Sequence, residues 1–558
     1  MPRRRRSVFA SRPSYGRSAM WLEPGTRRRR GRGPRRFLAP LVAVLALAAA
    51  GAAVAYIVLG PRQGDARRSV AQKFAAAWAK GDRAAMWALA DADTRKAYPL
   101  KRFSATYRAA ERAATVAAVR TGPVRTARGD RLVVPVSVRT RNFGTLRGDV
   151  VLPVLTVGKG AAVRWRPFLR LPGLRPGESV TRRILTRPRR AAILAADGRR
   201  LDRIPAAAAI VGRPPSAENP GSGLQRRFDA RLGGRAGAEL RFGRRLIKRV
   251  KVRRGRAVHA TISPGMQRAA QQALGNRLGG VAVLRPRDGS VLALAGLAVS
   301  GPQPPGSTFK IVTVSAALQN GIAKPTSTYP VQTAARLSGV LLRNASNESC
   351  GGSLVNAFIV SCNSVFAPLG AKLGARRLVA AAERFGFNET PRIPSAKVSR
   401  ISQASALKDS LAVGAAAIGQ DRDLATPLQM ASVGAAIAER GVRAKPRIVR
   451  SDPVIRHRAA PAQVARQVRT MMIGVVRGGT GTAAAIPGVQ VAGKTGTAEL
   501  RPTAGGPPDP KNTDAWFVAF APASNPRVVV GVMLVGAGAG GAAAAPIARR
   551  VLQSALGR

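Results

Sequence analysis

Three short segments, far apart in the sequence, carry residue types that can perform acyl transfer. In the first, Ser307-Thr308-Phe309-Lys310, a hydroxyl and an amine are three residues apart, a spacing that places both side chains on one face of a helix. A lysine whose pKa is lowered by burial can take the proton of a nearby serine, so the two residues can act as base and nucleophile. Pro304, Pro305 and Gly306 precede Ser307 and predict that a helix begins here, where developing negative charge is favoured.

This first signal is weak by itself, because a capped helix with a solvated lysine has the same pattern. Ser405-Ala406-Leu407-Lys408 repeats the spacing, and we interpret that copy as coincidental. Two further segments change the interpretation. Ser361-Cys362-Asn363 follows 54 residues after Ser307, and Lys494-Thr495-Gly496-Thr497 follows 187 residues after it, inside a predicted strand over 489–497. Glycine within a strand is typical of a place where a ligand backbone comes close.

In this order the three segments match the Ser-x-x-Lys, Ser-x-Asn and Lys-Thr-Gly motifs of penicillin-recognising enzymes. From residue 37 to the C-terminus the chain resembles a class B penicillin-binding protein, a monofunctional peptidoglycan D,D-transpeptidase. Asp421 stands where that family often has a glycine. The other segments that carry the resemblance are 190–201, 222–224, 262–267, 419–420, 426–431 and 514–518.

The resemblance implies a role for each motif residue. Ser307 attacks the carbonyl of a D-Ala-D-Ala stem peptide and Lys310 takes its proton. Ser361 and Asn363 relay the proton to the leaving D-Ala and hold the substrate amide. An amine of a neighbouring stem peptide then resolves the acyl-enzyme, and beta-lactams stall at the acyl stage.

In the third motif, the resemblance implies that Lys494 keeps Lys310 deprotonated. Thr495 and Thr497 bind the terminal carboxylate beside Gly496, and backbone N–H groups of Ser307 and Thr497 form an oxyanion hole. No cofactor or metal is implied. A separate membrane glycan polymerase is the implied partner.

Other functions can use the same site. A D,D-carboxypeptidase or a beta-lactamase would hydrolyse the acyl-enzyme, whereas a beta-lactam sensor or scaffold would not turn over. The predicted anchor and the extra N-terminal domain favour the transpeptidase. A sensor would need a cytoplasmic effector, which a 36-residue basic tail does not provide.

The predicted domains follow composition. Residues 1–36 hold thirteen arginines and a single acid, Glu23, which is typical of a disordered cytoplasmic tail. Residues 37–59 carry no charge and predict one transmembrane helix, with the catalytic part outside the cytoplasm. A cleaved signal peptide is the alternative, and the long basic segment before residue 37 argues against it.

The rest of the chain is predicted to form two domains and a connector. Residues 65–182 predict a small α+β domain that resembles the NTF2-like domain of the methicillin-resistance type of these proteins. Within it, Val70, Phe74 and Trp78 predict a helix, and 132–139, 150–157 and 163–171 predict strands. Residues 183–259 read as a connector or reduced dimerisation-type region. Residues 260–558 are large enough for the transpeptidase domain, a serine beta-lactamase-like α/β fold.

Charge and cysteine content exclude several classes. The net charge of +67 is dispersed along the chain, and aromatic residues make up 4%, so we do not predict a nucleic-acid protein. Two distant histidines make a metal centre a poor hypothesis. Cys350 and Cys362 can pair outside the cytoplasm or remain separate thiols, and spacing alone leaves both possibilities open.

Overall fold

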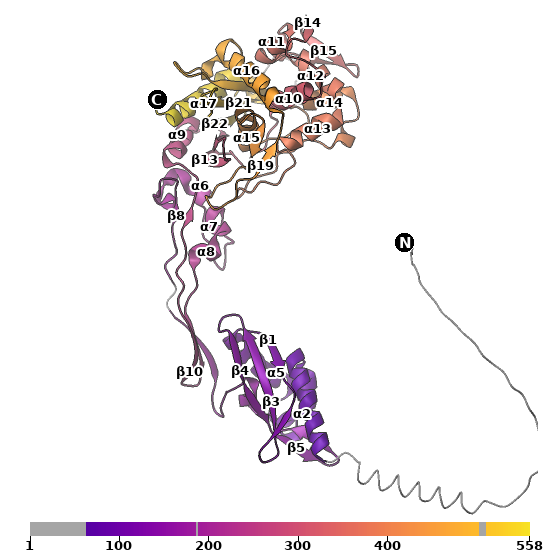
Figure 1. Ribbon diagram of the computed structural model, residues 1–558, viewed down its shortest axis with the longest axis vertical. Helices are drawn as coiled ribbons and strands as arrows, with labels where there is room; N and C mark the ends of the chain where they lie inside the picture. Colours follow the sequence, from indigo (N-terminus) through magenta and orange to yellow (C-terminus); the bar gives the residue numbers. More distant parts are fainter. Residues whose placement is uncertain (1–62, 186–187, 501–508) are drawn as a thin grey trace, which may run out of the picture. The chain divides into compact units, whose positions relative to one another are not determined.

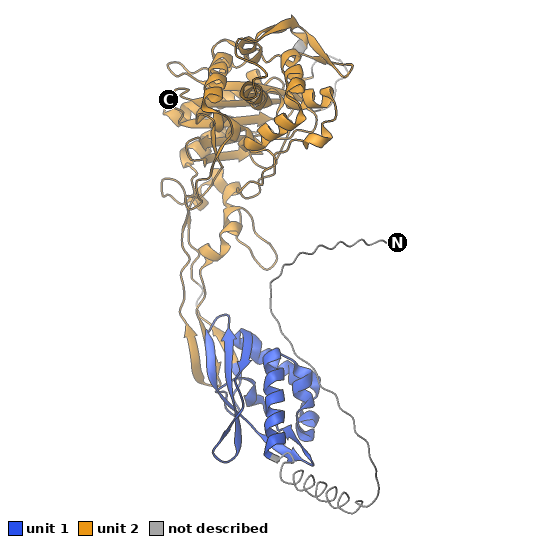
Figure 2. Ribbon diagram, turned by 45° about the vertical axis from the view of Figure 1, so that its right-hand side comes forward, with its two compact units in different colours: residues 1–180 blue, residues 181–558 orange. Residues whose placement is uncertain are grey.

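The computed structural model describes residues 63–185, 188–500 and 509–558. The predicted basic tail and membrane anchor lie outside these ranges. Within them, none of the helices combines the length and the apolar character needed to cross a membrane. The chain divides into two compact units, residues 1–180 and 181–558, which Figure 2 colours separately.

The described part of unit 1, residues 63–180, contains four helices, a small antiparallel sheet in the strand order β1-β3-β2 with β4 also paired to β3, and the separate pair β5-β6. The helices are α2 (Gln63–Lys80), α3 (Arg83–Ala88), α4 (Ala92–Ala97) and α5 (Leu100–Ala114). The strands are β1 (Val116–Thr121), β2 (Arg125–Ala127), β3 (Arg131–Thr140), β4 (Thr145–Leu152), β5 (Val154–Val157) and β6 (Gly160–Val163). Helix α2 packs against strands β1 and β6 (Figure 1).

The predicted helix and the first predicted strand of unit 1 are confirmed. Phe74 and Trp78 of α2 are buried, and Gly81 follows the helix with a φ of 77°. The strand predicted over 163–171 is wrong. Strand β6 ends at Val163, and the chain then forms a 3-10 turn, η1 (Pro167–Arg170). Proline has a fixed φ and no N–H to donate to a neighbouring strand, so a strand does not continue through Pro167. These elements make a small α+β domain, and its assignment to the NTF2-like fold stays a prediction.

The centre of unit 2 is a five-stranded antiparallel sheet in the order β13-β12-β22-β21-β20. Its strands are β12 (Gly279–Arg285), β13 (Ser290–Gly296), β20 (Ala492–Glu499), β21 (Thr513–Ala521) and β22 (Val528–Leu534). Strands β12 and β13 form an antiparallel hairpin. The residues of the interior strands are buried except for Arg285 at the end of β12, since helices cover both faces.

Two separate hydrophobic cores lie on the two faces of this sheet. One core packs Phe517 and Val530 against helices α9 (Pro264–Leu274) and α17 (Gly540–Leu556). The other packs Trp516 and Val518 with α15 (Pro427–Ala438) and the helices around it. Figure 1 shows α9 and α17 beside each other at the sheet. The other helices of this part are α10 (Lys310–Gln319), α11 (Leu354–Ile359), α12 (Asn363–Leu373), α13 (Ala375–Arg384), α14 (Ser410–Ala417) and α16 (Ala462–Gly478).

Short strand pairs surround the helices. Their strands are β14 (Thr328–Gln332), β15 (Ala334–Leu337), β16 (Val340–Arg343), β17 (Cys350–Ser353), β18 (Val442–Ala444) and β19 (Arg456–Arg458). Strand β14 pairs with β17, β15 with β16 and β18 with β19.

Residues 183–259 have a structure of their own. Strands β7, β9 and β10 form a sheet in the order β10-β9-β7, and β8 pairs with β11 in parallel. These strands are β7 (Val180–Ile184), β8 (Ile193–Leu194), β9 (Ala238–Phe242), β10 (Arg245–Val250) and β11 (Val258–His259), and the helices are α6 (Ala208–Val211), α7 (Gly223–Arg227) and α8 (Asp229–Gly233).

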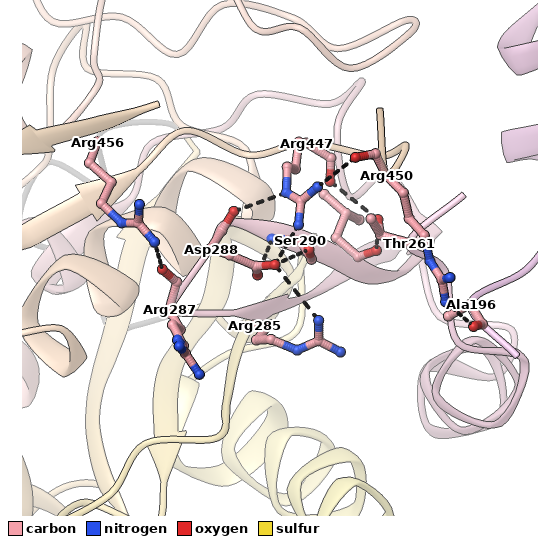
Figure 3. A network of polar contacts seen from close by, with 10 residues as sticks. Ala196, Thr261, Arg285, Arg287, Asp288, Ser290, Arg447, Arg450 and Arg456 are labelled. Atoms are coloured by element: carbon pink, nitrogen blue, oxygen red, sulfur yellow. Dashed lines mark hydrogen bonds and ion pairs between the residues drawn. The ribbon is translucent and has the colours of Figure 1, made fainter. Parts of the chain in front are cut away.

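A polar network links the turn of the β12-β13 hairpin to Arg447 and Arg450, and Arg450 connects it to Ala196 (Figure 3). Asp288, in the turn of the β12-β13 hairpin, accepts hydrogen bonds from Arg447 and from Ser290 Oγ. Thr261 Oγ1 donates to the carbonyl of Val291 at 2.7 Å, and Arg450 donates to the carbonyl of Ala196. Because the Arg447 side chain is mostly buried, the network is screened less than surface ion pairs.

Candidate active site

Ser307 lies in a 3-10 turn, η4 (Gly306–Phe309), that runs directly into α10. This confirms the predicted helix start. Ser307 is half-buried, and its Oγ makes no hydrogen bond with any residue that the structure describes. The turn itself is fixed, because Gly306 N donates to the carbonyl of Gly419 at 2.9 Å and Thr308 Oγ1 donates to that of Pro305 at 2.7 Å. The fold therefore fixes the turn that carries Ser307 and leaves the Ser307 hydroxyl without a hydrogen bond to the described residues.

Lys310 is fully buried and reaches the second motif. Its Nζ donates to the carbonyl of Ser361 at 2.6 Å and to Asn363 Oδ1 at 2.7 Å, and it lies 3.4 Å from Ser361 Oγ. The ammonium also lies over the ring of Phe366, 5.5 Å from its centroid. The first two motifs, 51 residues apart, are thus joined at one side chain.

Lys494 brings the third motif to the same point. Its Nζ donates to Ser361 Oγ at 2.8 Å and to the Thr495 carbonyl at 3.1 Å, over the ring of Phe358. The hydroxyl of Ser361 therefore lies between two lysine side chains. Such an arrangement can pass a proton between a base and a leaving group.

The pKa values of both lysine side chains are lowered, which favours their neutral amine forms. Burial, with a smaller contribution from the charge of Lys494, lowers the pKa of Lys310 well below its usual value. Burial lowers the pKa of Lys494 to about 7. At neutral pH, Lys310 can act as a base while a large fraction of Lys494 still carries its charge.

Ser361 has an uncommon backbone conformation, with a φ of 68° directly after α11. The N–H of Ser361 donates to the carbonyl of Phe358 at 3.2 Å, and the N–H of Cys362 donates to that of Ala357 at 2.8 Å. Cys362 also forms a disulfide with Cys350. The disulfide answers the question that the cysteine spacing left open, and it fixes the chain on one side of Ser361.

Glycine at position 496 lets the third motif lie against the nucleophile turn. A Cβ on Gly496 would come within 2.8 Å of the Pro305 carbonyl oxygen and of Trp516 Cβ. On the same strand, Thr495 Oγ1 lies 2.6 Å from Thr480 Oγ1, and Thr497 Oγ1 accepts a hydrogen bond from Gly540 N at 3.3 Å. Two threonine hydroxyls therefore stand on the strand that borders the turn of Ser307.

The structure brings all three motifs together. Hydrogen bonds link Lys310, Ser361, Asn363 and Lys494, and β20 contacts η4. Sequence reasoning missed Thr480, Gly540 and the two phenylalanines beneath the ammonium groups. No local motif marks those residues, because only the folded chain places them beside the site.

Comparison with known proteins agrees with this geometry. The family described as penicillin binding protein transpeptidase domain matches residues 279–553. The peptidoglycan D,D-transpeptidase PbpA of Mycolicibacterium smegmatis is 35% identical over 401 residues, which is 60% of this chain and 79% of that protein. The chain belongs to the penicillin-binding protein transpeptidase family.

Solved structures of the family resemble the chain over about two thirds of its length. The D,D-transpeptidase domain of a peptidoglycan glycosyltransferase from Eggerthella lenta has a TM-score of 0.59 and 30% identity, and it matches 67% of this chain and 99% of that one. A penicillin G acyl-enzyme complex of penicillin-binding protein A from M. tuberculosis has a TM-score of 0.57 and 29% identity, and it matches 66% of this chain and 100% of that one.

Two other sequence features are explained by the fold. Asp421, where the family often has glycine, has a φ of 65°, a left-handed conformation that aspartate adopts more readily than most residues. Ser405 and Lys408, the second Ser-x-x-Lys, are both exposed. The interpretation of that copy as coincidental agrees with the exposure of both side chains.

Proposed function

We propose that the protein is a peptidoglycan D,D-transpeptidase that cross-links stem peptides through an ester on Ser307 and releases D-Ala. Beta-lactams, in this proposal, acylate the same hydroxyl. The observation that carries it is the position of Lys310, whose buried Nζ bonds both residues of the second motif beside a second buried lysine. That set of groups suits acyl transfer to a serine at neutral pH.

In the acylation step, Ser307 Oγ attacks the carbonyl between the two D-Ala residues and gives its proton to the neutral amine of Lys310. The new C–O bond forms an ester, and the C–N bond of the substrate breaks. Ser361, hydrogen-bonded to Lys494 and close to Lys310, passes the proton to the departing amine. The backbone N–H groups of Ser307 and Thr497 hold the oxyanion, and one such donor contributes about 3–4 kcal/mol in other enzymes.

Substrate binding uses the third motif and Asn363. Lys494 and the hydroxyls of Thr495 and Thr497 take the terminal carboxylate, while the backbone at Gly496 runs beside the substrate. Asn363 holds the substrate amide. Its own amide group is already oriented, because Nδ2 donates to the carbonyl of Arg343 at 3.0 Å and Oδ1 accepts from Lys310.

We further propose that residues 37–59 anchor the chain in the cell membrane, with residues 1–36 in the cytoplasm and the catalytic unit outside. The uncharged segment after thirteen arginines supports this orientation. An NTF2-like identity for residues 65–182 and a separate membrane glycan polymerase as partner belong to the same proposal. The α+β composition of unit 1 supports the first of these.

The test is to incubate residues 63–558 with a D-Ala-D-Ala stem pentapeptide and a stem-peptide acceptor, and to analyse the products by mass spectrometry. We expect a cross-linked dimer and one released D-Ala per cross-link, both absent in Ser307→Ala and both retained in Ser405→Ala. Released D-Ala without dimer would identify a carboxypeptidase instead. Hydrolysed penicillin in multiple turnovers would identify a beta-lactamase.

A further inference from the structure

A cavity of about 440 Å³ opens beside the second motif, outside the network of the two lysines. Its lining includes Asn356 of α11 and the residue that follows this helix, Val360. The lining also includes Val331 of β14 and the segment from Glu348 to Gly352. Residue 360 directly precedes Ser361, so the cavity adjoins the catalytic segment along the chain.

The cavity offers a carboxylate, an amide and apolar side chains. Glu348 is exposed, and its carboxylate has no ion pair or hydrogen bond with the described residues. Asn356 Nδ2 donates to the carbonyl of Gly351 at 3.0 Å, which leaves its Oδ1 as an acceptor. Val331 and Val360 supply methyl groups. Two oxygen acceptors beside aliphatic surface suit an ammonium group on an aliphatic stem.

Acidic residues are few in this chain relative to basic ones. The sequence has 93 basic and 26 acidic residues, and arginines pair with most of the acids that form ion pairs in the described parts. The catalytic network itself contains two lysines. A cationic substrate is therefore repelled by the molecule as a whole, and a local carboxylate that no arginine neutralises is a place where it can bind.

The backbone at Glu348 is tied to the second motif. Asn344 Nδ2 donates to the Glu348 carbonyl at 2.9 Å, and Asn344 Oδ1 accepts from the N–H of Ser364 at 2.8 Å. The neighbouring wall residue Cys350 is bonded covalently to Cys362. Three connections thus tie the carboxylate-bearing segment to the residues on either side of Asn363.

We propose that this cavity binds the acceptor of the cross-linking reaction, a primary ammonium on an aliphatic stem, and that Glu348 is its positioning residue. The inference rests on the proposed function, because it names the second substrate of that site. Before attack the ammonium gives one proton to solvent. The amine nitrogen then attacks the ester on Ser307, a C–N bond forms, the C–Oγ bond breaks, and a second amine proton returns to Oγ.

The test measures how one acyl-enzyme divides between two acceptors. Residues 63–558 are acylated with an N-benzoyl-D-alanyl thioester in the presence of Nα-acetyl-L-lysine amide, and the ratio of aminolysis to hydrolysis is determined. This ratio does not depend on the rate of acylation. We expect it to fall about threefold to fivefold in Glu348→Gln, the range expected for loss of a partly exposed ion pair, and further in Glu348→Lys.

Two controls separate recognition of charge from a general disturbance. Methanol is an uncharged acceptor, so the ratio of methanolysis to hydrolysis should not change in Glu348→Gln. Asp421→Asn removes a carboxylate from the loop beside the nucleophile turn and keeps a residue that tolerates its positive φ. We expect the aminolysis ratio of Asp421→Asn to equal that of the wild type.

The outcomes distinguish failure of the acceptor-site inference from failure of the proposed function on which it rests. An unchanged aminolysis ratio in both Glu348 variants overturns the inference and leaves the proposed function intact. An equal fall in Asp421→Asn, or a parallel fall with methanol, also overturns it. Failure of the wild type to form any acyl-enzyme with either the thioester or penicillin overturns the proposed function, and the inference with it.

Discussion

At the scale of single residues, the site depends on two buried lysines with different roles: Lys310 acts as a base and Lys494 carries positive charge. Lys310 contacts the second motif through a carbonyl and an amide oxygen, acceptors that carry no charge. The described hydrogen-bond partners of Lys310 include no carboxylate, and its neutral form is favoured. Lys494 has the same kind of environment and remains closer to its charged form at neutral pH.

These environments predict a bell-shaped pH dependence of penicillin acylation. A lysine is neutral above its pKa and charged below it. The rate should rise as Lys310 loses its proton at low pH and fall above about pH 7 as Lys494 loses the charge that binds the penicillin carboxylate. Stopped-flow acylation kinetics from about pH 5 to about pH 9 measure both limbs.

The variant Lys494→Arg separates the two limbs. A guanidinium stays charged throughout this range, so the decline at high pH should disappear in the variant while the limb at low pH remains. A wild-type rate that rises steadily to the alkaline limit would contradict the assignment of roles to the two lysines.

At the scale of elements, the turn of Ser307 and the third-motif strand lie against each other without room for a side chain. Gly306 has a φ of 52°, and a Cβ there would come within 2.5 Å of the Thr497 carbonyl oxygen. The turn would have to move away from β20. A displacement of that kind separates the nucleophile from the oxyanion site.

We therefore predict that Gly306→Ala slows penicillin acylation by about 100-fold, the loss typical of a misplaced catalytic group. Gly339→Ala is the matched control, because Gly339 also has a positive φ, of 80°, but open space around it. Both variants carry backbone strain, and only the first carries the clash. Equal acylation rates in the two variants would contradict the account.

The disulfide provides a second prediction at this scale. It closes a segment of 12 residues and fixes Cys362 beside the left-handed Ser361. Cys350→Ala should lower the free energy of unfolding by about 2–4 kcal/mol, as measured by urea denaturation. It should also slow acylation, since Ser361 loses its restraint. Wild-type protein in reductant serves as the control and should match the variant, whereas unchanged stability in both would argue against a structural role.

The sequence predicted the elements whose signal is local. Alternating apolar residues predicted strand β3. The motif set predicted the polar side chains that hydrogen bonds join around Ser361. Local patterns could not predict the hydrogen-bond partner of each side chain in the site. The spacing in the first motif predicted that Lys310 and Ser307 lie on one face of a helix, and it did not predict that the hydrogen bonds of Lys310 go to the second motif. Likewise, the hydroxyls of Thr480 and Thr495 lie within hydrogen-bond distance because α16, which ends just before Thr480, packs against β20.

At the scale of the whole molecule, the described site residues all belong to unit 2. Both hydrophobic cores of the transpeptidase sheet, and the network around Asp288, also lie within residues 181–558. Unit 1 has its own core around Trp78, Tyr107 and Trp165, where Trp165 Nε1 donates to the Tyr107 hydroxyl at 3.0 Å. Each unit thus has the apolar interior that an independently folding domain needs.

We predict that residues 181–558 alone fold and are acylated by penicillin at the rate measured for residues 63–558. Circular dichroism and a single cooperative thermal transition check the fold, and acylation kinetics check the site. A fragment that unfolds, or that folds but reacts much more slowly, would show that unit 1 contributes to the active conformation.

The central claim is that Ser307 is the nucleophile of a penicillin-recognising site, and intact-protein mass spectrometry after exposure to penicillin G tests it most directly. The account predicts one stable adduct on the wild type and on Ser405→Ala, and none on Ser307→Ala with the fold retained. An adduct that persists in Ser307→Ala, or that disappears in Ser405→Ala, would contradict the account.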